Sequence, residues 1–211
     1  EDFGGLSLKD ALRKKELDLK SLLRISSKVS ETLGLIHKSN IIHLDIKPDN
    51  ILINPEKGEV KIADFGISAV LTHANDELYN PDVIEGTLSY MSPEQTGRMN
   101  RGVDYRTDIY SLGATIYEML TGEVPFKSKD PMELIHSHIA RQPLPPDHLN
   151  PSIPPVLSAI ILRMLSKNPE ERYQNCLGLM ADIDECLNQL NQKGRVDDFP
   201  IATKDISIRF N

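Results

Sequence analysis

The sequence predicts a mainly α-helical fold with a small β hairpin region, and three observations support this. Apolar residues recur at helical spacing over residues 19 to 38. Two short apolar segments, residues 51 to 53 and 60 to 63, flank an Asn-Pro-Glu-Lys-Gly turn, as the strands of a hairpin do. Further helical patterns follow over residues 107 to 120, 131 to 140, 154 to 165 and 176 to 190.

The first elements have clear boundary signals. Ser7 is a good N-cap for a short helix over residues 8 to 15, and Asp10 lies in its first turn, where the helix dipole favours an acid. Residues 41 to 43 predict a short buried strand. The helix over residues 19 to 38 presents one apolar stripe to a core, made by Leu19, Leu22, Leu23, Ile25, Val29, Leu33 and Ile36.

The other segments predict connections. Residues 67 to 92 are polar and without a sustained period, so we expect a long loop, and such loops are usually functional. Proline-rich stretches at 142 to 146 and 150 to 155 are expected to form stiff connections between helices. Residues 193 to 211 hold a few apolar residues without a period, which is typical of a linker.

Composition excludes several classes of protein. The 211 residues suit one domain with a tail, and 24 basic against 31 acidic residues give a net charge of −7 without a basic block, which argues against a nucleic-acid partner. No stretch approaches the roughly 20 apolar residues of a membrane span, and the start lacks a signal-peptide pattern, so we expect a cytoplasmic protein. Cys176 and Cys186 are expected to be buried, reduced thiols.

The chemistry concentrates in two short segments, His43-Leu44-Asp45-Ile46-Lys47-Pro48-Asp49-Asn50 and Asp64-Phe65-Gly66. The Asp45 carboxylate can align a hydroxyl and accept its proton, and Lys47 can neutralise phosphoryl oxygens. Asn50 and Asp64 offer oxygen ligands of the kind that Mg²⁺ prefers. Any one of these aspartates taken alone would be an ordinary loop acid. Together, at this spacing, they predict phosphoryl transfer.

The first segment resembles the catalytic loop of protein kinases, and Asp64-Phe65-Gly66 resembles their magnesium-binding motif. The resemblance continues, in family order and over nearly all of residues 1 to 190, through Ser92-Pro93-Glu94, Asp108-Ile109-Tyr110-Ser111-Leu112-Gly113 and Arg172. It implies that residues 1 to 192 are a protein-kinase-like C-terminal lobe, from the hinge to the last helix. Residues 193 to 211 would then be a linker toward a following module.

The resemblance also assigns roles around a bound ATP and its magnesium ions. Asp45 would be the base, Lys47 would contact the transferring phosphate, and Asn50 and Asp64 would hold Mg²⁺. Thr87 resembles the threonine that bridges Asp45 and Lys47 in serine/threonine kinases, which implies a protein substrate with a serine or threonine acceptor. Three more residues match the adenine site: Glu1 and Phe3 match the hinge, and Leu52 matches the apolar floor under the base.

Other matched residues have structural roles in the resembled family. His43 would pack beneath the Asp64-Phe65-Gly66 segment instead of acting in catalysis. Asp108 would accept hydrogen bonds from the backbone of the catalytic loop, although an acid at a helix start can also simply favour the helix dipole. Glu94 and Arg172 would form a buried ion pair.

One departure from the family pattern concerns regulation. Most kinases carry arginine at the position of Leu44, where it binds a phosphorylated residue of the activation loop. Because leucine has no charge, we expect that activity does not depend on loop phosphorylation through this contact. A competing hypothesis is a noncatalytic, pseudokinase-like interaction module in a signalling scaffold. Retention of Asp45, Lys47, Asn50 and Asp64 favours the enzyme.

The second departure is the absence of the glycine-rich loop and the strand lysine that, in the family, precede the hinge. The resemblance implies a chain that lacks the N-terminal lobe and is inactive alone. A finer resemblance, carried by residues 92 to 101, 103 to 108 and the tail, is to the kinase domains of very large bacterial signalling proteins. There, an ATPase module and often a sensor region with a histidine kinase follow, so such a downstream module is an expected partner.

Overall fold

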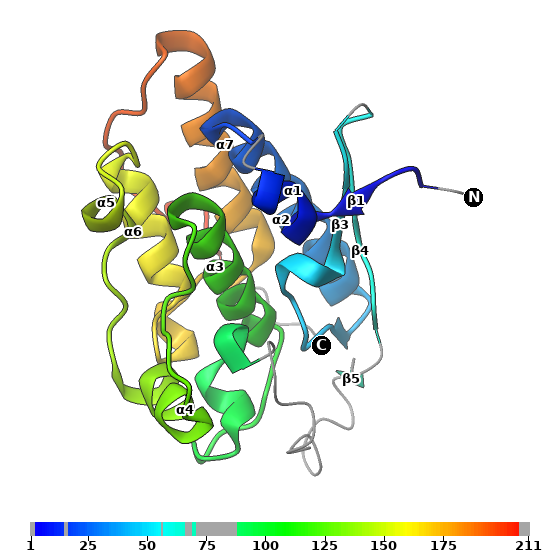
Figure 1. The fold of residues 1–211 in the computed structure, drawn as a ribbon, viewed down its shortest axis with the longest axis vertical. Coiled ribbons are helices and arrows are strands. Elements are labelled where there is room, and N and C mark those ends of the chain that lie inside the picture. Colours follow the sequence, from blue (N-terminus) through cyan, green and yellow to red (C-terminus); the bar gives the residue numbers. More distant parts are fainter. Residues whose placement is uncertain (1–2, 15–16, 56, 66–68, 71–87, 207–211) are drawn as a thin grey trace.

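A computed structural model describes residues 3 to 14, 17 to 55, 57 to 65, 69 to 70 and 88 to 206. Helices make up most of the fold (Figure 1). They are α1 (Leu8–Lys14), α2 (Leu19–Lys38), α3 (Arg106–Thr121), α4 (Pro131–Ala140), α5 (Pro146–Leu149), α6 (Pro155–Met164) and α7 (Cys176–Lys193). Short 3-10 turns include η1 (Pro48–Asn50), η2 (Leu88–Tyr90), η3 (Pro93–Thr96) and η4 (Pro169–Glu171).

The strands form two small antiparallel sheets. One has the order β1-β3-β4, and the other pairs β2 with β5. The strands are β1 (Leu6–Ser7), β2 (Ile41–Ile42), β3 (Ile51–Asn54), β4 (Glu59–Ile62) and β5 (Ala69–Val70). In the predicted hairpin of β3 and β4, Ile51 is opposite Ile62 and Asn54 is opposite Glu59. The predicted fold class, mainly α with a small hairpin, is therefore confirmed.

The helical core is built around α3, whose residues from Thr107 to Tyr117 are all buried. α2 packs along α7, and α3 packs on α6 (Figure 1). Gly113 makes the second contact possible, because a Cβ there would lie only 2.8 Å from the Cβ of Met164. α2 begins at its N-cap Asp18, which accepts from the Ser21 amide, and it buries the predicted stripe, including Leu22, Val29 and Leu33.

The N-cap of α1 and the two cysteines match their predictions. Ser7 accepts from the Asp10 amide at 3.1 Å, as expected of the N-cap of α1. Cys176 and Cys186 are both buried free thiols, as predicted. Most of the predicted loop over residues 67 to 92 lies outside the described residues. In the described part of the chain, no helix is both long and apolar enough to cross a membrane.

Residues 195 to 206, which lie in the predicted linker, are more ordered than the sequence pattern indicated. After α7, residues 195 to 206 pack back on the helices, and Val196, Phe199 and Ile201 contact the core. The Asp205 carboxylate accepts from the Gln174 amide at 2.9 Å, just before α7 begins. Periodicity did not predict this packing because the contacts are made by isolated apolar residues and by a single carboxylate.

A buried ion pair joins two distant segments of the fold. The Arg172 guanidinium donates to both carboxylate oxygens of Glu94, at 2.6 and 2.8 Å, and both side chains are almost fully buried. Thr107 donates to the same carboxylate, and the guanidinium lies 4.9 Å from the centre of the Tyr110 ring. The ion pair that the resemblance implied is therefore present, and its hydrogen bonds compensate for desolvation.

Replacing Arg172 with leucine tests how much this pair contributes to stability. The substitution leaves the Glu94 carboxylate buried without its partner, so we expect the free energy of unfolding to fall by roughly 3 to 5 kcal/mol. The matched control is Lys28→Leu, which removes the half-exposed pair with Glu31 and should cost less than about 1 kcal/mol. Urea denaturation of both variants gives the comparison. Equal losses would show that burial of the pair is unimportant.

Candidate active site

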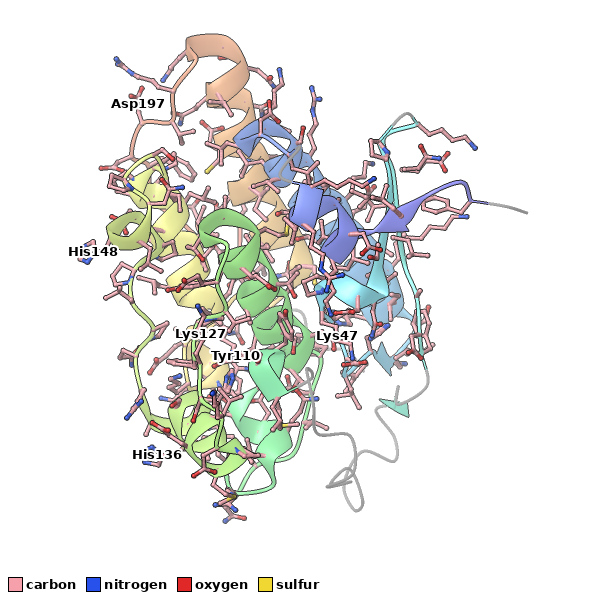
Figure 2. The ribbon with its side chains drawn as sticks, viewed as in Figure 1. Lys47, Tyr110, Lys127, His136, His148 and Asp197 are labelled. Atoms are coloured by element: carbon pink, nitrogen blue, oxygen red, sulfur yellow. The ribbon has the colours of Figure 1, made fainter. Side chains whose placement is uncertain are left out.

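The candidate site is built on residues 43 to 50, which run from β2 into η1 and β3 and are here named the Asp45 loop. Asp45 is the central side chain and is 9% exposed. Lys47, labelled in Figure 2, donates to its Oδ2 at 2.7 Å. Asn50 donates from Nδ2 to the same Oδ2 and to the Asp45 carbonyl, each at 2.8 Å. The structure thus brings three of the predicted residues together.

These hydrogen bonds place the Asp45 carboxylate and the Asn50 amide as the predicted chemistry requires. One carboxylate oxygen of Asp45 is held by a cation and an amide, so the orientation of the group is fixed before substrate arrives. Because the amide nitrogen of Asn50 faces Asp45, the amide oxygen, which is the atom that Mg²⁺ would bind, lies outside this pair of hydrogen bonds.

Asp64 follows β4, the strand that pairs with β3, two residues after that strand ends. The Ala63 amide donates to the Asn50 carbonyl at 2.8 Å, which ties the segment before Asp64 to the end of the Asp45 loop. Asp64 has a φ of 62°, a strained value for a residue with a Cβ. Within the part of the chain that the structure describes, no cluster of three or more His, Cys, Asp or Glu side chains could hold a metal by itself. Two oxygen ligands nevertheless suit Mg²⁺, which keeps waters and binds phosphate oxygens.

His43 packs against the segment that carries Asp64. Its Nε2 lies 3.0 Å from the Ala63 carbonyl, and its ring centre lies 4.7 Å from that of Phe65. The Asp45 amide donates to its Nδ1 at 3.3 Å. These contacts agree with the structural role that the resemblance implied for His43.

Asp108 of α3 clamps the start of the Asp45 loop. Its carboxylate accepts from the His43 amide at 2.9 Å and from the Leu44 amide at 2.8 Å, and it is fully buried. The expected anchoring of the loop to the helical core is therefore present. The clamp holds Leu44 at a φ of 70°, a backbone conformation that costs free energy for a side chain of this size.

His37 completes the set of groups around Asp108, and the sequence analysis missed it. Its Nε2 lies 2.8 Å from Oδ2 of Asp108, and its Nδ1 lies 3.6 Å from Sγ of Cys176. Burial opposes protonation of the imidazole, but the hydrogen bond to Asp108 and the neighbouring Cys176 outweigh it and raise the pKa of His37 to about 10. At neutral pH the imidazolium therefore offsets the buried charge of Asp108. A histidine in the last turn of α2 gave no sequence signal for this role.

The remaining predicted site residues are less well supported. Glu1 and Thr87 lie outside the described residues. Phe3 lies against the hairpin, where its carbonyl accepts from Asn54 Nδ2 at 2.9 Å and its ring faces Lys61. Leu52 is partly buried on β3, opposite Ser7 of β1. The hinge and adenine-floor assignments stay predictions.

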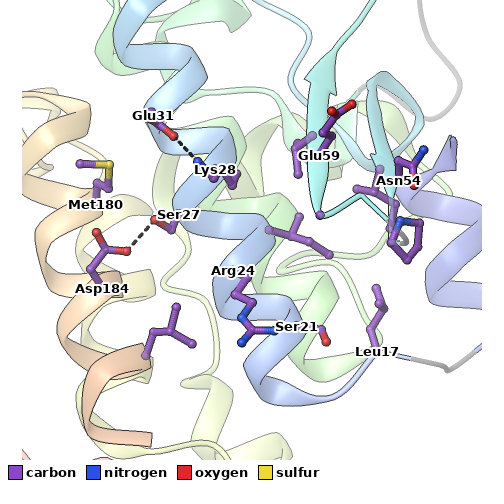
Figure 3. Close-up of a pocket in the computed structure, with 16 residues that line it drawn as sticks. Leu17, Ser21, Arg24, Ser27, Lys28, Glu31, Asn54, Glu59, Met180 and Asp184 are labelled. Carbon is purple, nitrogen blue, oxygen red and sulfur yellow. Dashed lines mark hydrogen bonds and ion pairs between the residues drawn. The ribbon is translucent and has the colours of Figure 1, made fainter. Parts of the chain in front are cut away.

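A separate pocket of about 620 Å³ lies between α2, the hairpin and α7 (Figure 3). Its walls carry two internal interactions, Ser27 with Asp184 at 2.6 Å and Lys28 with Glu31 at 2.8 Å. No residue of the Asp45 loop lines it. It is therefore distinct from the candidate active site.

Comparisons with known proteins agree with the geometry. A model of the protein kinase domain family matches residues 1 to 189. A probable serine/threonine-protein kinase of Clostridium perfringens is 38% identical over 187 residues, which cover 86% of this chain and 26% of the relative. The serine/threonine-protein kinase PknB of Mycobacterium tuberculosis is 34% identical over 184 residues, or 87% of this chain and 29% of the relative.

PknB of Mycolicibacterium smegmatis is 37% identical over 161 residues, which cover 76% of this chain and 25% of the relative. The chain thus spans about a quarter of the length of these curated relatives. The family model covers the Asp45 loop, Asp64, Asp108 and the Glu94–Arg172 ion pair. The chain therefore belongs to the protein kinase domain family.

Proposed function

We propose that this chain is the C-terminal lobe, residues 1 to 192, of a serine/threonine protein kinase that transfers the γ-phosphoryl group of ATP to a protein hydroxyl. The observation that carries the proposal is the orientation of the Asp45 carboxylate by Lys47 and Asn50, on a loop anchored to the core by Asp108. A carboxylate acting as base needs this kind of fixed position. Named relatives that are serine/threonine kinases support the same assignment.

Each residue of the site has a defined task in this proposal. Asp45 orients the acceptor hydroxyl and takes its proton as the phosphoryl group moves. Lys47 stays within reach of Asp45 and places positive charge beside the phosphoryl oxygens. Asn50 and Asp64 would hold Mg²⁺, which, when bound with ATP, neutralises the charge on the phosphates.

The acceptor and the surroundings of the lobe belong to the same proposal. Thr87 would bridge Asp45 and Lys47, a pattern of serine/threonine kinases, so the partner is a protein with a serine or threonine acceptor. Glu1, Phe3 and Leu52 would meet the adenine. Because ATP is the phosphoryl donor, the lobe is proposed to work in the cytoplasm.

Full activity is proposed to need an N-terminal lobe, since no glycine-rich phosphate-binding loop occurs in the 211 residues. A downstream ATPase or sensor module, reached through the linker over residues 193 to 211, is the other proposed partner within a bacterial signalling protein. Residues 195 to 206 of that linker pack on the helices, so the path of the chain after α7 is fixed over these residues.

The substitution Asp45→Asn tests the proposed reaction. It keeps the shape of the side chain but removes the base, so kcat should fall by roughly 10² to 10⁴. The measurement is transfer of labelled phosphate from ATP and Mg²⁺ to a generic protein substrate, made with the complete reading frame that contains this chain. The same assay on the 211-residue chain alone should give negligible transfer.

The matched control is Asp184→Asn, which removes a carboxylate on α7 that contacts Ser27, away from the Asp45 loop. It should keep the activity of the unmodified protein. Equal phosphate incorporation by Asp45→Asn and the unmodified protein would overturn the catalytic assignment. It would favour the alternative of a noncatalytic, pseudokinase-like interaction module.

A second experiment addresses regulation. The Leu44 side chain is apolar and only 3% exposed, so it cannot bind a phosphate group. We expect Thr72→Ala, Tyr79→Phe and Ser89→Ala, made one at a time, to leave kcat within about threefold of the unmodified protein. Kinase assays with mass spectrometry of the active protein provide the check. A residue that is phosphorylated in the active protein, and whose replacement abolishes transfer, would contradict the expectation.

A further inference from the structure

Gln95 makes a contact that connects the segment before α3 to the Asp45 loop. It lies in η3, between Ser92 and Thr96, and is partly buried. Its Nε2 donates to the Leu44 carbonyl at 2.8 Å, across 51 residues of sequence. Its Oε1 accepts from the Ser92 amide at 3.0 Å. Because both ends of the side-chain amide are used, its orientation is fixed.

This contact acts on a peptide that other contacts already constrain. Leu44 has a φ of 70°, and its amide is already held by Asp108. The carbonyl that Gln95 holds belongs to the peptide unit joining Leu44 to Asp45, so a rotation of that unit would move the Asp45 backbone. The Asp45 amide, on the same peptide, donates to Nδ1 of His43. Leu44 is therefore fixed at its amide by α3 and at its carbonyl by η3.

We propose that Gln95 is a positioning residue that sets the orientation of Asp45, linking the Asp45 loop to η3 through a neutral amide. The inference rests on the proposed function, because the position of Asp45 matters only if Asp45 acts on the acceptor hydroxyl. The link needs no charge on either side, which suits a loop with leucine at position 44. It also needs no phosphorylated residue.

The same amide joins the loop to a second fixed point of the core. Glu94, the neighbour of Gln95, is held by Arg172 at 2.6 and 2.8 Å and by Thr107 at 2.8 Å. η3 is thus anchored independently of Asp108. A contact from an anchored segment can hold a strained backbone, whereas a contact from a mobile one could not.

The first test is Gln95→Met, which keeps the length and flexibility of the side chain and removes both hydrogen bonds. We expect kcat to fall roughly 10- to 100-fold while the KM for ATP changes little, because the reacting groups are misplaced and nucleotide binding is not altered. The assay uses the complete reading frame, and thermal melting confirms that the variant is folded. An unchanged kcat would overturn the proposal.

The second test is Gln95→Glu, whose pH dependence a merely structural role would not produce. An ionised glutamate still accepts from the Ser92 amide but turns an oxygen toward the Leu44 carbonyl, whereas a protonated glutamate can donate to that carbonyl. The ratio of the variant's kcat to that of the unmodified protein should therefore rise as the pH falls from about 8 to about 5.5. Taking the ratio removes any pH dependence that the two proteins share, and a flat ratio would count against the proposal.

Two further arms separate this inference from the function on which it rests. Gln189→Glu is the matched control, since Gln189 also accepts from a backbone amide, that of Asp197, but lies on α7. Its kcat ratio should stay constant with pH. If Asp45→Asn is inactive and Gln95→Met keeps full kcat, only the positioning role fails. If Asp45→Asn keeps full activity, the proposed function itself fails.

Discussion

The fully buried Asp108 carboxylate has three hydrogen-bond partners among the described residues, and the geometry of the candidate active site depends on them. A buried carboxylate is stable only when its hydrogen-bonding capacity is filled. The amides of His43 and Leu44 and the ring of His37 fill it here, at 2.8 to 2.9 Å. The requirement to satisfy this charge therefore fixes the first two residues of the loop that carries Asp45. Since α3 is buried along most of its length, the loop is attached to a helix of the core.

Backbone strain at the site follows from this attachment. Leu44 and Asp64 both have positive φ values, which each cost free energy and persist only when neighbouring contacts hold them. Asp108 holds the amide of Leu44, and Gln95 holds its carbonyl. The Ala63 amide, bonded to the Asn50 carbonyl, holds the segment before Asp64. The strained residues are thus next to the groups proposed to perform the chemistry.

Sequence reasoning succeeded where the signal is local and failed where it is not. The apolar periods predicted α2, α4 and the β3–β4 hairpin within a residue or two, because burial of one face imposes that period. The cluster of Asp45, Lys47 and Asn50 was predictable because its members are close together in the sequence. The contacts of His37 with Asp108 and of Gln95 with Leu44 span 71 and 51 residues, and neither leaves a periodic trace. The packing of residues 195 to 206 was missed because it depends on isolated apolar residues and on one carboxylate, that of Asp205.

Asp108 holds the backbone at the start of the Asp45 loop by accepting from the amides of His43 and Leu44. Amide hydrogen exchange of the Asp108→Asn variant tests it most directly, because the amide group of asparagine cannot accept from both backbone amides. We expect faster exchange at His43 and Leu44, with protection of the α2 and α7 core amides kept near that of the unmodified protein. Unchanged protection at His43 and Leu44 would show that the loop is held by something other than Asp108.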